Sequence, residues 1–187
     1  MASELYVETL KGLTSGANAN KVIIPAGQTL DASAGTLVPS SGGVVKVEKH
    51  EFTSDQTILS TSLVDVTDSE FNFTPSLSSS RLLIMCDVHY YNEASSTNNG
   101  WQLVVKVDGT PVIAEGNDFE IYKNNLGSSG WDVYGRVHRQ MMYTNTSTSA
   151  KAIKLAASTY VATSGNRLQI SAGGGFTTNI TVMEIAG

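Results

Sequence analysis

The sequence predicts an all-β fold: an antiparallel, jelly-roll-like β-sandwich formed by residues 44–187, preceded by an irregular segment formed by residues 1–43. Three observations lead to this prediction. Short apolar segments alternate with a period of two residues, which is typical of strands. Clusters of Gly, Asn, Ser and Thr separate these segments at short intervals. No long segment shows a convincing helical period, and the pattern predicts about eight strands.

Residues 1–43 differ from the rest of the chain because Gly and Pro interrupt every apolar segment. Residues 5–10 and 22–24 each favour a short strand, but no longer element can form. Alone, this segment has too little apolar surface to fold. We therefore expect an attachment or oligomerisation segment that packs against copies of itself about a symmetry axis, or that lies on another protein.

The first strands of the sandwich are predicted at 44–52, 58–67 and 71–74, and the last of these could also continue the second. In the second strand, Val64 and Val66 are expected to point inward. Turn-forming residues at 75–80 then lead to the strand around which the sheet is organised.

That central strand is predicted at 82–91. One of its faces is apolar throughout: Leu82, Ile84, Cys86, Val88 and Tyr90. On the other face, Leu83 and Met85 are followed by Asp87, His89 and Tyr91. We expect the first half of the strand to be covered on both faces, and the second half to run out toward solvent or a subunit boundary.

A polar loop at 92–100 precedes the next alternating segment, at 101–108. Asp108-Gly109 is the strongest hairpin signal in the chain, because a type I′ turn requires positive φ at both of its central residues. The return strand is predicted to begin at 111–114.

The remaining strands are predicted at 131–143, 153–161, 168–170 and 180–185. Within this part, the segment KAIKLAA at 151–157 also has helical propensity. We favour a strand there, because Ser, Thr and Asn residues flank the segment closely.

Three parts of the sequence resemble virion-associated proteins of bacteriophages, especially marine phages, which are known as tail fibres or head fibres. These parts are SLVDVTDSEFNFTPSLSSSRLLIM, the Asp108-Gly109 hairpin and the closing ITVMEIAG. The likeness covers residues 44–187, and a leader of the type KVIIPAGQTLDASAG commonly precedes it in such proteins. The resemblance implies a virion structural protein made in the host cytoplasm: a homotrimeric tail fibre or fibre-tip protein that takes part in host attachment and binds other virion proteins through residues 1–43. The alternative is a capsid decoration or head-fibre (cement) protein, in which residues 1–43 lie on the capsid lattice.

Composition limits the possible partners. The formal net charge is -5 and the Lys and Arg residues are scattered, which argues against nucleic acid as a partner because neutralising phosphates requires clustered cations. Apolar runs of about eighteen residues are lacking, so we expect no membrane insertion. Only 16% of residues are charged, against about 25% in typical domains, and such a surface suits subunit packing or extracellular exposure. The single cysteine, Cys86, is expected to be buried as a small apolar residue.

The sequence suggests no catalytic, metal-binding or cofactor-binding motif. The candidate acid-base residues are His50, His89 and His138, with Asp87 near His89, but no third partner or nucleophile motif accompanies them. Asp65, Asp68 and Glu70 have oxygen ligands at close spacing, but they lack the glycine of a calcium loop. We therefore expect a protein that is not an enzyme and that holds no metal or cofactor.

A carbohydrate-active enzyme is the competing class. It would require paired carboxylates at the separation that hydrolases use. The only pairs that the sequence offers are Asp118 with Glu120, and Asp87 with Asp132.

Aromatic and amide side chains gather around two loops, an arrangement with which proteins bind sugars. The predicted receptor-binding residues are Tyr91, Asn98, Asn99, Trp131 and Tyr134. We expect Tyr91, Asn98 and Asn99 to lie at the exposed end of the head and to contact a host cell-surface glycan. The alternative for Trp131, as for Trp101, is a position in the core, in phase with apolar neighbours.

Overall fold

The computed structural model of the 187-residue chain describes residues 26, 41–94, 99–112, 121–123, 131–162, 166–171 and 176–187, with side chains for all of these except 94, 99, 121–123, 131, 166 and 167. The chain divides into two units, Met1–Leu37 and Val38–Gly187. Of the predicted segment 1–43, only residues 26 and 41–43 are among the described residues.

The described residues form strands and include no helix, so none of their elements is a helix that could cross a membrane. The strands are β1 (Val44–Phe52), β2 (Gln56–Ile58), β3 (Val64–Asp65), β4 (Phe71–Phe73), β5 (Ser80–Ala94), β6 (Asn99–Val107), β7 (Thr110–Pro111), β8 (Ile121–Lys123), β9 (Trp131–Asn145), β10 (Lys151–Thr159), β11 (Asn166–Ile170) and β12 (Thr178–Ala186).

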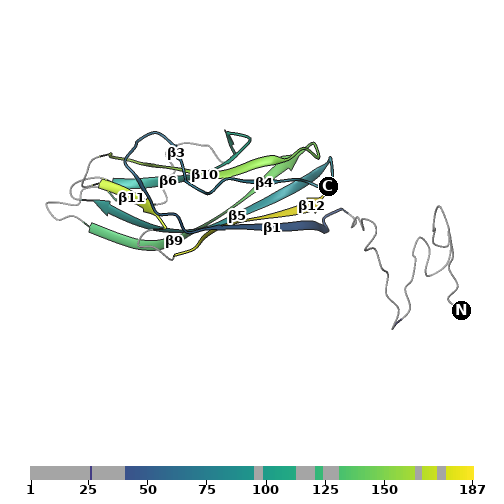
Figure 1. The fold of residues 1–187 in the computed structure, drawn as a ribbon, viewed down its shortest axis with the longest axis horizontal. Helices are drawn as coiled ribbons and strands as arrows, with labels where there is room; N and C mark the ends of the chain where they lie inside the picture. Colours follow the sequence, from purple (N-terminus) through teal and green to yellow (C-terminus); the bar gives the residue numbers. More distant parts are fainter. Residues whose placement is uncertain are drawn as a thin grey trace, which may run out of the picture. The chain divides into compact units, whose positions relative to one another are not determined.

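These strands form two antiparallel sheets that pack as two layers (Figure 1). In the first, which we call the β5 sheet, β9 pairs with one edge of β5, and β12 and β11 share the other edge. On their far sides, β12 pairs with β1 and β11 pairs with β2. In the second, the β10 sheet, β6 lies on one side of β10 and carries β7 and β8, while β3 and β4 lie on the other side. When β1–β2, β3–β4, β7–β8 and β11–β12 are each taken as one interrupted strand, this is the strand order of an eight-stranded jelly roll. The predicted fold class is confirmed.

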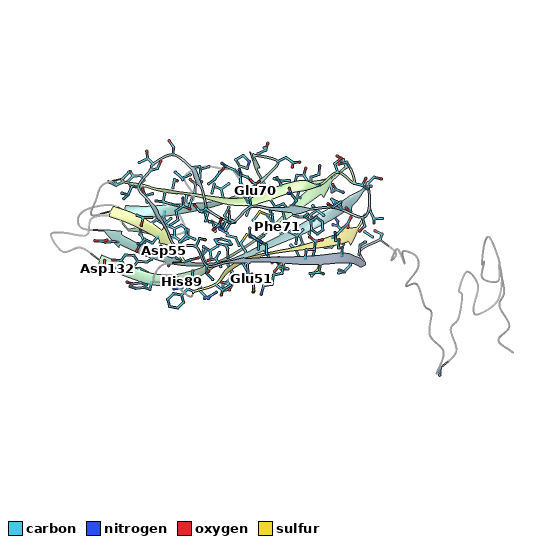
Figure 2. All side chains as sticks on the ribbon, in the orientation of Figure 1. Glu51, Asp55, Glu70, Phe71, His89 and Asp132 are labelled. Atoms are coloured by element: carbon cyan, nitrogen blue, oxygen red, sulfur yellow. The ribbon has the colours of Figure 1, made fainter. Side chains whose placement is uncertain are left out.

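The core lies between the two sheets, where side chains from both layers meet (Figure 2). The apolar face of β5 points inward as predicted, and all five of its residues are buried. Facing them from the β10 sheet are Trp101, Leu103, Val105, Ile153 and Leu155. Trp101 is therefore a core residue, and Cys86 is a buried free thiol, as expected. Each fully buried Leu, Ile or Val side chain of this core contributes about 1.5–3 kcal/mol to folding.

The two local predictions with the clearest physical basis are confirmed. Asp108 and Gly109 have φ values of 51° and 78°, and the pairing of Val107 with Thr110 makes them the two central residues of the hairpin. The segment KAIKLAA is part of strand β10, which pairs along its length with β6.

The outer face of β5 differs from the prediction. Its second half does not run out into solvent, because His89 and Tyr91 are only 6% and 8% exposed. Aromatic rings from neighbouring segments cover them: Phe176 stacks on His89, and Tyr134 packs against Tyr91. The sequence pattern shows which face a residue occupies, but not which side chain from another strand lies over it.

Candidate ligand-binding face

Polar and aromatic side chains gather on the outer face of the β5 sheet, along the β5–β9 pair. Antiparallel pairing sets Asp87 opposite His138, His89 opposite Arg136, Tyr91 opposite Tyr134 and Met85 opposite Gln140. With Phe176 and Asn179, these side chains form what we call the binding face. Long-range pairing of two fifteen-residue strands holds them in place, so the backbone beneath the face is rigid.

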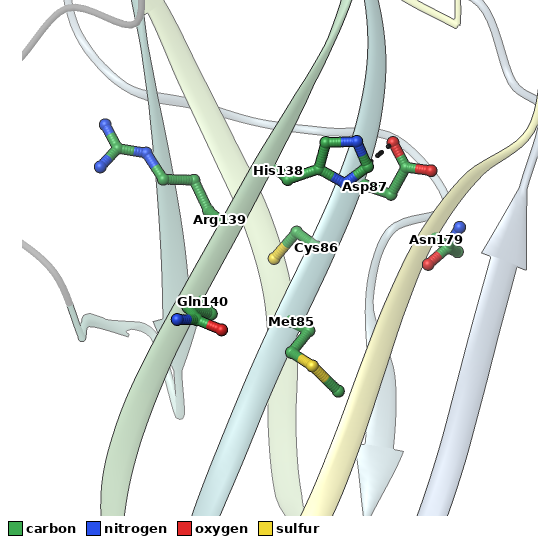
Figure 3. A pocket seen from close by; sticks show the side chains of 7 residues that line it. All are labelled: Met85, Cys86, Asp87, His138, Arg139, Gln140 and Asn179. Atoms are coloured by element: carbon green, nitrogen blue, oxygen red, sulfur yellow. Dashed lines mark ion pairs between the residues drawn. The ribbon is translucent and has the colours of Figure 1, made fainter.

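The Asp87 carboxylate is the electrostatic centre of this face. Its Oδ2 accepts a hydrogen bond from Nη1 of Arg136 at 2.7 Å, and Nη2 of the same guanidinium donates to the backbone oxygen of Thr177 at 3.3 Å. The other oxygen, Oδ1, is buried and accepts no hydrogen bond in the described structure. Nδ1 of His138 lies 3.7 Å from this oxygen, which is too far for a hydrogen bond. The dashed line in Figure 3 joins these two side chains. Asp87 therefore keeps one unused acceptor.

A cavity of about 410 Å³ opens beside this carboxylate (Figure 3). Its lining residues come from β5, β9 and β12: Met85, Cys86, Asp87, His138, Arg139, Gln140 and Asn179. The volume falls within the range of about 300–1,000 Å³ that is usual for small-molecule sites. The lining combines one carboxylate, one guanidinium, two amides and a histidine with the thiol of Cys86 and the apolar side chain of Met85, which is a set suited to a polar ligand.

His89 forms the next part of the face. Its ring stacks on that of Phe176 with a centroid separation of 4.0 Å and an interplanar angle of 10°. Burial lowers the pKa of His89, the charge of Arg136 lowers it further, and Asp87 opposes this change. The lowered pKa favours the neutral form of the imidazole, and its buried Nδ1 has no hydrogen-bond partner in the described structure.

Two of the predicted receptor residues, Tyr91 and Tyr134, lie together at the far end of the face. Their ring centroids are 4.4 Å apart, but only Tyr134 is accessible, with 67% of its surface exposed. Burial raises the pKa of Tyr91 to about 12, and a hydrogen bond to the Asp132 carboxylate adds to this. The expectation that Tyr91 is an exposed contact residue is therefore wrong, because Tyr134 covers it.

For the other three predicted receptor residues, Asn98, Asn99 and Trp131, the side chains lie outside the described part of the structure. Asn98 lies outside the described residues. Asn99 and Trp131 begin strands β6 and β9, but their side chains are not among those described.

The acid-base candidates are distributed over two regions. His50 stacks on Phe71 with a centroid separation of 5.2 Å, and its Nε2 lies 2.7 Å from the backbone oxygen of Asp68. His89 and His138 both lie on the binding face, where Asp87 contacts His138 and Arg136. Asp87 therefore contacts His138 and Arg136 of the neighbouring strand β9 and forms no dyad with His89, which the sequence had suggested.

The carboxylate pair Asp87 and Asp132 is not arranged for hydrolysis. Asp132 pairs with Glu93, six residues beyond Asp87 along β5, which corresponds to about 20 Å. A hydrolase pair is about 5–10 Å apart. The other pair, Asp118 and Glu120, lies outside the described residues.

The acidic residues considered for calcium are engaged by lysines. Asp65 contacts Lys106 at 2.5 Å and Lys154 at 2.7 Å, and Glu70 contacts Lys154 at 3.1 Å. The hydrogen bond from Lys106, followed by that from Lys154, lowers the pKa of Asp65. Within the described part of the chain, no group of three or more His, Cys, Asp or Glu residues is placed to hold a metal ion.

Sequence reasoning missed Arg136, Gln140, Phe176 and Asn179. A signal for the first two was present, because Tyr134, Arg136, His138 and Gln140 alternate along one face of the strand at 131–143. The sequence does not show which residues of β5 they oppose, and this register creates the cavity.

No protein-family model matches this chain, and no curated protein matches it. Among solved structures, the VP2 subviral particle of infectious bursal disease virus is 16% identical with a TM-score of 0.46, over 94% of this chain and 41% of that chain. The Gx strain of the same virus is 18% identical with a TM-score of 0.40, over 88% of this chain and 37% of that one. Dimeric latent PorU from Porphyromonas gingivalis is 12% identical with a TM-score of 0.42, over 75% of this chain and 13% of that one. The chain thus spans less than half the length of each of these proteins, and likenesses this weak carry no conclusion about activity or partners.

Proposed function

We propose that this chain is a non-enzymatic structural protein of a bacteriophage virion: a homotrimeric tail fibre or fibre-tip protein. In this proposal, the jelly-roll head at 44–187 takes part in host attachment, and residues 1–43 bind other virion proteins. The phage-like segments at 62–85 and 180–187 support it. So does the low content of charged residues, 16%, because long charged side chains are disfavoured at the centre of subunit contacts.

The observation that carries the proposal is a row of apolar side chains across the outer face of the β5 sheet. Pairing places Val47 beside Met183, Met183 beside Leu83 and Leu83 beside Met142. Val47 and Met142, at the two ends of this apolar row, are 52% and 47% exposed. An apolar row that crosses four strands is more than the single exposed apolar residues that are normal on a monomer.

A second and third copy of this chain are the occupants that fit the apolar row. The row begins on β1, the first strand after residues 1–43, and Val44 at the start of that strand is 50% exposed. Copies that are joined through their N-terminal segments would therefore hold these same apolar residues close to one another. Burying them between copies would remove the exposed surface from water and favour association.

Light scattering after size-exclusion chromatography of the full chain tests this contact. We expect a trimer for the unchanged protein and a monomer for Val47→Asp, because a charge in the contact would be desolvated without a partner. Leu59→Asp is the matched control, since Leu59 is equally exposed, at 51%, and lies outside the apolar row. A stable monomer for the unchanged chain would overturn the trimer.

Gold-labelled antibody on purified phage particles tests the location. Label at the tail or at fibre tips agrees with the proposal, whereas label spread over the capsid would favour a decoration or head-fibre protein. Absence of label from particles would exclude a virion component. Turnover of host-surface glycans by the purified chain would instead favour a carbohydrate-active enzyme.

A further inference from the structure

We propose that the cavity beside Asp87 binds an uncharged, hydroxyl-rich sugar unit of a glycan. This inference deepens the proposed attachment function, on which it rests, by assigning a site and a ligand class. It moves the contact away from the loop at 92–100 and onto the rigid surface of the β5 sheet. Asp87, Gln140 and Asn179 are the polar contacts, and Phe176 and Tyr134 are the apolar ones.

The first step of the argument is the unused acceptor on Asp87. Arg136 binds Oδ2 and fixes the carboxylate, while Oδ1 is buried beside the cavity and accepts no hydrogen bond in the described structure. An unsatisfied buried acceptor costs free energy, which a ligand donor would recover. A sugar hydroxyl is such a donor, and its hydrogen bond to a charged oxygen is stronger than one to a neutral acceptor.

The second step is the position of the two amides. Gln140 on β9 and Asn179 on β12 line the same cavity as Asp87. Because each amide carries both donors and acceptors, the pair can bind hydroxyls that act in either role. Met85 lies between them on β5 and offers an apolar contact for the C–H surface of a sugar ring.

The third step concerns two aromatic rings of the binding face that lie beyond the residues lining the cavity, Phe176 and Tyr134. Phe176 covers His89 with one face and remains 45% exposed, and its neighbour Thr177 is bound by the guanidinium of Arg136. Tyr134 lies four residues from His138 along β9, which is about 13 Å. The pairing of β5 with β9 places both rings toward the same end of these strands, beyond Asp87 and His138. They favour a ligand longer than one sugar ring, since each ring can cover an apolar sugar face.

The fourth step is charge. Two arginines lie at the cavity. Arg136 donates to Asp87 and to the Thr177 oxygen, and Arg139, which is one of the lining residues, turns its guanidinium away from Asp87 (Figure 3). A ligand carboxylate would lie close to that of Asp87 and be repelled by it. Neutral oligosaccharides are therefore favoured over sialylated or uronic-acid glycans.

The test is binding of the purified full chain to an array of neutral oligosaccharides built from glucose, galactose and mannose, with sialylated and uronic-acid oligosaccharides alongside. We expect binding to neutral members only. Asp87→Asn should weaken it about tenfold or more, which corresponds to losing one hydrogen bond to a charged group. Gln140→Ala removes a hydrogen bond to an exposed, neutral amide and should weaken binding about two- to tenfold. Asp65→Asn is the matched control, because it removes an ion-paired carboxylate on the other sheet.

Circular dichroism melting separates lost binding from lost folding. If Asp87→Asn unfolds because Arg136 loses its partner, the exposed Gln140→Ala variant still decides the question. The inference would be overturned if the unchanged chain bound no neutral oligosaccharide. It would also be overturned if the folded Asp87→Asn and Gln140→Ala variants bound as tightly as the unchanged chain. The oligosaccharide-binding results do not affect whether antibodies label the virion. The proposed function can therefore fail or stand independently of this inference.

Discussion

The carboxylate of Glu184 accepts a hydrogen bond from the backbone amide of Leu77 at 2.9 Å, although Glu184 is entirely buried. The amide of Ser76 donates to the same carboxylate at 2.8 Å, and the hydroxyl of Ser80 does so at 2.9 Å. Asn145 completes the arrangement by donating to the backbone oxygen of Leu77 and to the Ser80 hydroxyl. Strands β12 and β9 thus hold the turn that leads into β5, and they do so through a fully satisfied polar network inside the sandwich.

Replacing Glu184 with Ala should lower the free energy of unfolding by about 3 kcal/mol, because one buried and two partly buried donors lose their acceptor. Glu184→Gln should fall between Ala and the unchanged chain, since one amide oxygen can still accept. Denaturant unfolding measures both. The control is Glu51→Ala, at a glutamate whose side chain is 54% exposed, where the change should stay within about 0.5 kcal/mol. Equal losses at the two positions would show that the network adds no stability.

Glu184 also shows where sequence reasoning was incomplete. Alternation along 180–185 was read correctly as a strand, and it places Glu184 on the same inward face as Ile180 and Val182. A carboxylate in phase with core residues indicates a buried polar partner, and this signal was available. Its partners at Ser76 and Leu77 are more than a hundred residues away, so the sequence could not identify them.

The same distinction applies to the binding face. Alternation alone predicted that Asp87, His89 and Tyr91 share the outer face of their strand, and the structure agrees. It could not predict that Arg136 would lie beside Asp87, because a slip of one residue in strand pairing would move every side chain of β9 to the opposite face. The prediction that Tyr91 is exposed failed for a related reason: burial depends on the ring of Tyr134, which the register places over it.

The two tyrosines should therefore respond differently to substitution. Tyr91→Ala should destabilise the protein by about 3 kcal/mol, in the range for buried aromatic residues, whereas Tyr134→Ala should change stability by about 0.5 kcal/mol, because Tyr134 is 67% exposed. Thermal and denaturant unfolding would separate them. Similar, small effects for both would mean that the Tyr91 ring is accessible in solution.

Gly135 is a position where a single methyl group should matter. A Cβ added there would lie 2.8 Å from the Tyr90 hydroxyl oxygen and 2.9 Å from Cζ of the same ring. Tyr90 cannot move away freely, since it packs against Trp101 with ring centroids 4.6 Å apart in the core. We expect Gly135→Ala to cost about 1–3 kcal/mol through overpacking. The double variant Gly135→Ala with Tyr90→Phe tests the cause. It relieves only the contact with the hydroxyl oxygen, so it should recover part of the stability lost in Gly135→Ala. If the stability changes of the two single variants simply add, this contact is not the cause.

The pH dependence of stability should contain a contribution from His89. Its pKa is lowered in the folded state by burial and then by Arg136, against the opposing charge of Asp87, so the unfolded chain binds more protons there than the folded chain. Stability then rises with pH, and it is lost as pH falls below the ordinary histidine pKa of about 6.5 toward the lower folded value. One such proton accounts for a slope of at most about 1.4 kcal/mol per pH unit.

His89→Phe isolates this contribution, because a phenyl ring keeps the stack on Phe176 and cannot take up a proton. We expect the free energy of unfolding of the unchanged chain to fall between pH 7.5 and 5.5, and that of the variant to fall less. The lower limit of this window keeps most carboxylates ionised in both states. Urea unfolding at several pH values measures the two slopes. If the slopes coincide, proton uptake by His89 does not differ between the folded and unfolded states, and burial does not lower its pKa.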